Sequence, residues 1–168
     1  CRYRLTVRTQ DSQSCNRGPI PRSGTIIIFT IREMVDSKSK KVKDLKLEIY
    51  IESPVEEVFA YTLDSKNTPK WFTSIKEEIA LETPVKLGTK LKNRGDDKNN
   101  WNLYEITEFE KNKTFTLGQI GGEYHVRYTF RKNGTGTDFE YYEWVDKGKL
   151  SEPANMESLV LLKKIEIQ

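Results

Sequence analysis

The sequence predicts an α+β domain in which an antiparallel sheet curls around a helix near the C-terminal end. Three observations support this fold class. A strand with alternating apolar residues precedes two short helix-start signals, turn residues then recur roughly every 8–14 residues between strand-like segments, and an amphipathic segment closes the chain. A strongly bent sheet around one terminal helix tends to enclose a cavity, so this order of elements favours a protein that binds a small molecule.

The first elements are predicted from local signals. Residues 45–51 alternate between apolar and polar side chains, which is typical of a half-buried strand. Ser53, Pro54 and Glu56 have the spacing of a capping box, with Pro54 at the first helical position, so we expect a helix of about two turns that buries Phe59. Thr68-Pro69 repeats the start signal and predicts a second short helix.

A run of strands separated by turn signals is expected next. The predicted segments are a strand from Ile75 to about Thr83, then 87–92, 101–109, 114–120, 123–130 and 138–145. Pro153 opens the last segment, in which Met156, Leu159 and Val160 fall at helical spacing, so we expect a helix there.

Charge divides the 168 residues into two parts. Residues 1–44 hold ten Lys and Arg against four Asp and Glu, whereas residues 45–168 hold eighteen against twenty-one. We expect residues 1–44 to be a leading segment outside the core, flexible or non-native, and 45–168 to be one ligand-binding domain. Two explanations stay open for residues 1–33: sequence upstream of a biological start at Met34, or an ordinary basic arm.

The same composition excludes some classes of function. Charges of both signs are interspersed in residues 45–168, without the clustered Lys and Arg that nucleic-acid binding needs. No apolar run approaches the roughly 20 residues that span a bilayer, so we expect a soluble, cytoplasmic protein without stable membrane insertion. Both cysteines, Cys1 and Cys15, lie in the leading segment, and His125 is the only histidine, so neither a metal site nor a cofactor is expected.

Several motifs, in order, resemble the START-like or SRPBCC superfamily, which includes polyketide cyclases, pollen-allergen-like carriers and lipid-transfer domains. They are the run IYIESPVEEVF over 49–59, followed by Pro69–Phe72, Leu87–Thr89, Tyr104–Phe109, Gly136–Tyr141 and Leu162–Ile165. The resemblance covers 45–168. It implies a helix-grip fold, in which a curved seven-stranded antiparallel sheet surrounds a long C-terminal helix, with two short helices between the first two strands and a hydrophobic cavity between sheet and helix. The last helix of this chain looks short, at about four turns.

The candidate ligand-binding residues are those that the strand alternation and the helical stripe place on inward faces. They are Trp71, Tyr104, Ile106, Phe115, Leu117, Tyr128, Tyr141, Glu143 and Met156. Plain core packing is the alternative for each of the aromatic residues. Glu143 shares a strand face with Phe139 and Tyr141, so it would either anchor a polar ligand group or act as a base in the cavity, or lie in solvent at the rim. His125 is expected on the face opposite Tyr128.

Binding or carrying a small hydrophobic molecule of lipid, polyketide or isoprenoid type is the leading hypothesis. A cyclase or dehydratase that uses Glu143 and a cavity tyrosine as acid and base stays open, as does an interaction module similar to a chaperone regulator. The sequence predicts no nucleic-acid partner. It leaves open the ligand, any catalytic residue, the oligomeric state and whether the chain is an enzyme.

Overall fold

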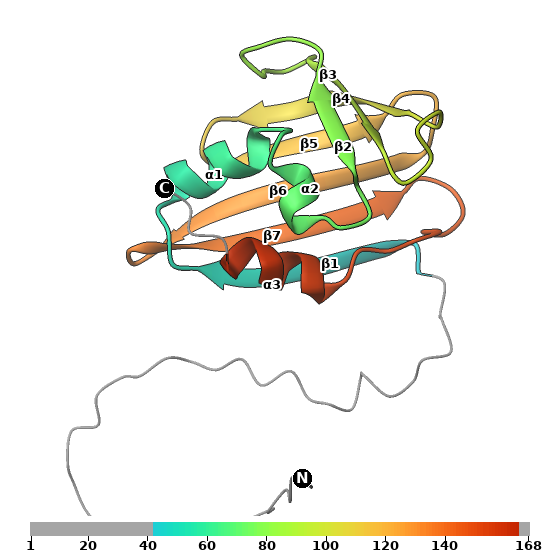
Figure 1. The fold of residues 1–168 in the computed structure, drawn as a ribbon. Helices are drawn as coiled ribbons and strands as arrows, with labels where there is room; N and C mark the ends of the chain where they lie inside the picture. The colour runs from blue at the N-terminus through green and yellow to red at the C-terminus, as the bar shows by residue number, and fades with distance from the viewer. Residues whose placement is uncertain (1–41, 165–168) are drawn as a thin grey trace, which may run out of the picture. The chain divides into compact units, whose positions relative to one another are not determined.

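A seven-stranded antiparallel sheet forms the frame of the domain in the computed structural model, which describes residues 42–164. The strands lie in the order β1-β7-β6-β5-β4-β3-β2 (Figure 1). They are β1 (Asp44–Ile51), β2 (Glu77–Ala80), β3 (Lys90–Arg94), β4 (Asn102–Glu110), β5 (Thr114–Gln119), β6 (Tyr124–Asn133) and β7 (Gly136–Val145). The helices are α1 (Val55–Leu63), α2 (Thr68–Trp71) and α3 (Met156–Lys164). The predicted α+β class, the antiparallel sheet and the C-terminal helix are confirmed.

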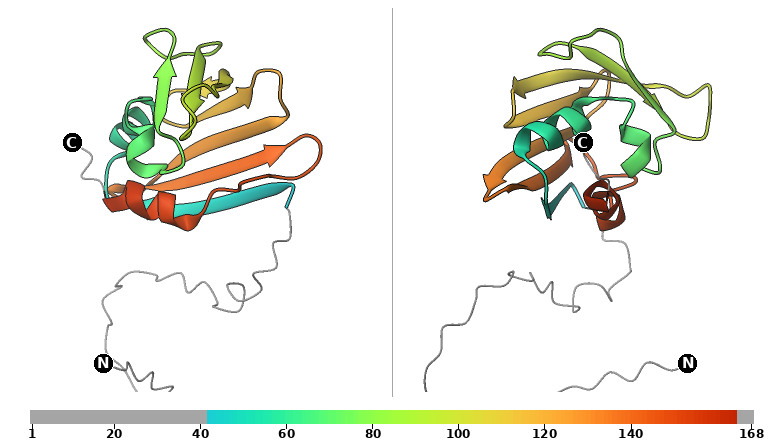
Figure 2. Two further views of the ribbon diagram at one scale, coloured as in Figure 1. Left: turned by 45° about the vertical axis from the view of Figure 1, so that its right-hand side comes forward. Right: turned by 60° about the vertical axis from the view of Figure 1, so that its left-hand side comes forward.

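All three helices lie on the concave side of the sheet, as the two views in Figure 2 show. Helix α1 packs against β6 and β7, α3 packs against β1, and α2 contacts α3 and β2. None of the helices within residues 42–164 is long and apolar enough to cross a membrane. The predicted leading segment lies almost wholly outside the described residues. The backbone carbonyls of Val42 and Lys43 already accept hydrogen bonds from Leu150 and Val145, at 2.9 and 3.1 Å.

The predicted capping box at the start of α1 is wrong. The helix begins at Val55, Pro54 occupies the N-cap position, and no side chain caps the helix. Ser53 therefore lies one residue too early to reach the first free amides of the helix. Its carbonyl instead accepts a 2.7 Å hydrogen bond from the Thr137 hydroxyl, which holds this corner against β7.

Several other boundaries differ from the predictions, and two of them have a clear local cause. The third strand starts at Lys90, because Gly88 has a φ of 83° and its amide donates to the Ile106 carbonyl at 2.8 Å, which makes residues 87–89 a turn held on β4. The last helix begins at Met156, three residues after Pro153. Asn155 is its cap, since its side-chain oxygen accepts from the Ser158 amide at 3.3 Å. The described part of α3 has nine residues, shorter than the long helix that the resemblance implies.

The core fills the space between α1, α2 and the middle strands. Phe59 of α1 makes edge-to-face contacts with Phe115 and Phe130, with ring centroids 5.8 and 5.2 Å apart. Trp71 of α2 packs on Tyr128 and Phe139, at 6.2 and 6.4 Å. This aromatic core occupies one end of the concave face and leaves the other end for the site described below.

The convex face of the sheet carries charged and polar pairs. The Glu140 carboxylate on β7 is bridged by Lys46 of β1 and Arg131 of β6, both at 2.9 Å. His125 stacks on Trp144 with 5.0 Å between ring centroids, and its Nε2 lies 3.0 Å from the Asp146 carboxylate. The expectation that His125 lies on the face opposite Tyr128 is confirmed.

Candidate functional site: a cavity on the concave face

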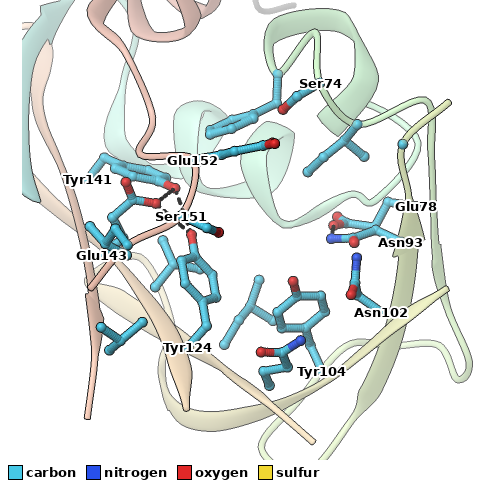
Figure 3. Close-up of a pocket in the computed structure, with 18 of the residues that line it drawn as sticks. Ser74, Glu78, Asn93, Asn102, Tyr104, Tyr124, Tyr141, Glu143, Ser151 and Glu152 are labelled. Atoms are coloured by element: carbon cyan, nitrogen blue, oxygen red, sulfur yellow. Dashed lines mark hydrogen bonds between the residues drawn. The ribbon is translucent and has the colours of Figure 1, made fainter. Parts of the chain in front are cut away.

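A cavity of about 450 Å³ opens between the concave face of the sheet and two connecting segments. The sheet wall comes from β2 to β7, and the covering segments are residues 72–75 after α2 and 149–152 before α3 (Figure 3). Its apolar surface is supplied by Phe72, Ile75, Leu117, Val126, Val145 and Leu150. Tyrosine, glutamate and amide side chains complete the wall, so the cavity is more polar than the hydrophobic pocket that the sequence predicts.

Glu143 forms the centre of the first polar cluster. Only 1% of this residue is exposed. One carboxylate oxygen accepts from the hydroxyls of Tyr124 and Tyr141, at 2.6 and 2.9 Å, and the other accepts from the Ala154 amide at 2.7 Å. Three donors therefore compensate the cost of burying this carboxylate. Glu143 faces the cavity and does not lie in solvent at the rim.

The tyrosines of this cluster hold their protons tightly. Burial raises the pKa of Tyr124 well above its ordinary value, and the negative charge of Glu143 raises it further. Burial also raises the pKa of Tyr141, with smaller contributions from Tyr124 and Tyr128. Both hydroxyls thus stay protonated at neutral pH and serve as donors to Glu143.

Glu78 forms the second polar cluster, on the opposite wall of the cavity in Figure 3. Its two oxygens accept from the Thr68 hydroxyl at 2.7 Å and from the Asn93 amide at 3.2 Å. Burial raises the pKa of this carboxyl, although both hydrogen bonds lower it in part. Tyr104 lies nearby, and burial followed by the Glu78 charge raises its pKa to about 12.

The structure brings five of the nine predicted site residues together and places four elsewhere. Tyr104, Leu117, Tyr128, Tyr141 and Glu143 line the cavity. The other four are Trp71, Ile106, Phe115 and Met156, of which the first three are buried in the aromatic core while Met156 is 38% exposed.

Simple physical reasons explain why these four residues lie outside the cavity. Ile106 and Phe115 face inward as predicted, but α1 covers their end of the sheet and Phe59 packs there. Trp71 turns into the core, where Tyr128 and Phe139 surround it. Met156 is the first residue of α3, and Leu159 and Leu162 form the buried stripe of that helix in its place.

Sequence reasoning missed several cavity residues. Tyr124 shares the inward face of β6 with Val126 and Tyr128, and this alternation was a usable signal. Glu78 and Asn93 come from short, strongly charged strands whose inward faces have no clear apolar pattern. The covering segment 149–152 has no periodicity at all, so its place over the cavity could not be predicted.

Metal binding has no evident ligand set in this part of the chain. Within residues 42–164 no group of three or more His, Cys, Asp or Glu side chains is arranged to hold an ion. The chemistry that the described cavity offers is hydrogen bonding, from side chains that donate and side chains that accept, together with apolar contact.

Comparison with known proteins bears on both the fold and the family. The sequence profile of the family described as "Polyketide cyclase / dehydrase and lipid transport" matches residues 43–163. A search of curated proteins gives no match.

Solved structures with the same fold come from several bacteria. A protein from Mesorhizobium loti has a TM-score of 0.57 at 14% identity, and one from Chromobacterium violaceum has 0.54 at 16% identity. A protein from Thermus thermophilus has 0.54 at 14% identity. In each case the match covers 72% of this chain and 94% of the other. At these identities the likeness concerns the fold alone.

Proposed function

The chain belongs to the polyketide cyclase/dehydrase and lipid transport family, and we propose that it binds or carries a small, largely hydrophobic molecule of lipid, polyketide or isoprenoid type in the cavity on its concave face. The observation that carries the proposal is the cavity itself. Its volume of about 450 Å³ falls within the usual range of about 300–1,000 Å³ for ligand sites. A cavity of this size gives less support to the interaction-module hypothesis, for which a filled interior would be expected.

The polar clusters support binding through fixed contacts. Glu143 already accepts three hydrogen bonds, so its role is to hold Tyr124 and Tyr141 in place. Apolar surface from Leu117 and Val126 would contact the body of the ligand. Such a wall combines hydrophobic affinity with a few oriented polar groups, as ligand pockets commonly do.

A second candidate function is a cyclase or dehydratase reaction. One observation favours it: burial raises the pKa of Glu78, which brings a cavity carboxyl closer to the range in which it can exchange protons with a substrate. Tyr104 lies on the same wall and, as a protonated hydroxyl, could orient a carbonyl group. Turnover of a bound polyketide would favour this function over carriage alone.

Filling the cavity tests the binding proposal. Val126 is buried and lines the cavity, and Ser151 is an exposed residue of the covering segment that also lines it. We expect the wild type to bind the neutral probe Nile red at one equivalent. Val126→Trp and Ser151→Trp should each weaken that binding at least tenfold.

The matched control is Leu103→Trp, an exposed position on the strand that also carries Tyr104. It should leave Nile red binding unchanged. Urea melts would verify that each variant is folded, since overpacking costs about 1–3 kcal/mol. Saturable binding that neither cavity variant weakens would overturn the proposal.

A further inference from the structure

The hydroxyl protons of the Glu143 cluster are already used within the cluster. The two tyrosine hydroxyls have one hydrogen each, and both oxygens lie within 2.9 Å of the same carboxylate oxygen. The two hydroxyl oxygens are also 3.2 Å apart, so a proton not given to Glu143 is shared between them. In either arrangement, the cluster has no hydroxyl hydrogen left for a ligand.

The cluster can therefore only accept hydrogen bonds from a ligand. Each tyrosine oxygen keeps lone pairs while it donates to Glu143, and these two oxygens belong to residues that line the cavity. A ligand group that is itself only an acceptor, such as an ether, a ketone or a carboxylate, would leave these oxygens unpaired. Leaving a largely buried oxygen without a hydrogen-bond partner costs affinity.

The charges around the cavity act in the same direction. Neither Glu78 nor Glu143 has a Lys, Arg or His partner within 4 Å among residues 42–164. Of the two cations in the lining, Arg94 is paired with Glu77 at 2.7 Å. The other, Lys149, is exposed. Of the two exposed carboxylates in the lining, Glu123 is paired with Lys147 at 3.3 Å, whereas Glu152 has no cationic partner within 4 Å among residues 42–164. An anionic ligand would thus meet uncompensated negative charge.

We infer that the cavity selects an uncharged ligand with hydroxyl groups, which donate to the oxygens of Tyr124 and Tyr141, and discriminates against carboxylate ligands such as fatty acids. This inference rests on the proposed function and narrows it to a class of ligand. Glu78, on the opposite wall, would accept from a second hydroxyl of the same molecule.

Three ligands with one rigid skeleton test the inference. They are 4,4′-dihydroxystilbene, 4,4′-dimethoxystilbene and stilbene-4,4′-dicarboxylate. The affinity of each is measured by its displacement of bound Nile red. We expect the dihydroxy compound to bind at least tenfold more tightly than the dimethoxy compound, which has no donors. The dicarboxylate should bind most weakly at pH 7.

Two variants assign the preference to named residues. Tyr124→Phe should weaken the dihydroxy compound about three- to tenfold, the value of one hydrogen bond, without weakening the dimethoxy compound. Tyr142→Phe is the matched control, because its hydroxyl bonds to Asp44 on the other face of the same sheet. Glu78→Gln should strengthen dicarboxylate binding at least threefold, a gain that a damaged fold cannot produce.

Failure of the inference and failure of the proposed function give different results. If Nile red binds and Val126→Trp abolishes the binding, but the dihydroxy and dimethoxy compounds compete equally, the proposed function stands and the selectivity is wrong. Tightest binding of the dicarboxylate would also overturn the selectivity. If neither Nile red nor any of the stilbenes binds saturably, the binding function itself is contradicted.

Discussion

Glu78 makes the domain sensitive to pH at the scale of a single residue. Burial raises its pKa from the ordinary value of 4.5, so the folded protein keeps this proton to a higher pH than the unfolded chain does. Ionisation of Glu78 therefore opposes folding, and its stabilising proton is lost as the pH rises through the raised pKa. Below about 4.5 both states are protonated, so this contribution to stability is fully present and no longer changes with pH.

We expect Glu78→Gln to remove this pH dependence. As the pH rises from 4 to 8, the free energy of unfolding of the wild type should fall relative to that of the variant. Urea melts across this range measure the difference, and other titrating groups cancel because both proteins contain them. Glu123→Gln, at an exposed carboxylate of the cavity lining, is the control and should show the same fall in the free energy of unfolding as the wild type. If the wild type instead gained stability relative to the variant as the pH rose, the expected direction of the pH dependence would be wrong.

The sequence predicted the side of the sheet on which Glu143 lies, but not its partners. Strand alternation was enough to place it with Phe139 and Tyr141. Its contact with Tyr124 depends on the register of β6 on β7, where Glu143 lies opposite Val126 and Tyr124 opposite Val145. A local pattern does not specify this register.

The Ala154 amide, the third donor to Glu143, comes from a segment without regular structure. Nothing in its sequence indicates that it returns to β7.

At the scale of the elements, the two helix starts differ in how they are capped. Asn155 caps α3 through its side chain, whereas Ser53 makes no side-chain cap at α1. Asn155→Ala should lower the free energy of unfolding by about 1 kcal/mol. Ser53→Ala should change it by less than about 0.5 kcal/mol, because the contact that Ser53 makes uses its backbone carbonyl. Equal losses in urea melts would contradict the assignment of the caps.

Phe59 is the largest buried side chain of helix α1. Phe59 is 3% exposed and contacts the rings of Phe109, Phe115 and Phe130. Phe59→Ala should cost about 3–5 kcal/mol, because the cavity left behind cannot be filled by the surrounding rings. Tyr61→Ala on the same helix, at a partly buried position, should cost less. Denaturant melts of both variants would test this ranking.

The types of the elements could be predicted from the sequence more fully than their limits. Alternation and turn residues placed the strands, since these signals act over a few residues. The predicted start or end of an element was wrong where the decisive contact is with a residue distant in the chain, as at Ser53, whose carbonyl accepts a hydrogen bond from Thr137. The position of the cavity was unpredictable for the same reason, because it depends on which end of the sheet α1 covers.

At the scale of the whole molecule, the described fold needs the chain from about Val42 onward. Its carbonyl accepts from Leu150, beyond β7, and that of Lys43 accepts from Val145, the last residue of β7. Strand β1 then pairs with β7 along its whole length. A chain that begins at Lys40 should therefore unfold in urea at the same midpoint as the full chain. A chain that begins at Ile49 loses most of β1 and should not fold. If the chain that begins at Lys40 failed to fold, the expectation that the leading segment lies outside the core would be contradicted.

The strand order has a consequence for how the chain is made. From β2 to β7 each strand pairs with the next one in the sequence, whereas β1 pairs only with β7, the last strand. During translation the partner of β1 is not synthesised until the roughly 85 residues between Ile51 and Gly136 have been added. This takes several seconds at about 5–20 residues per second. For that time an alternating apolar strand has no partner on the nascent chain. The ribosome-bound protein should thus present β1 to chaperones until β7 emerges and completes the sheet.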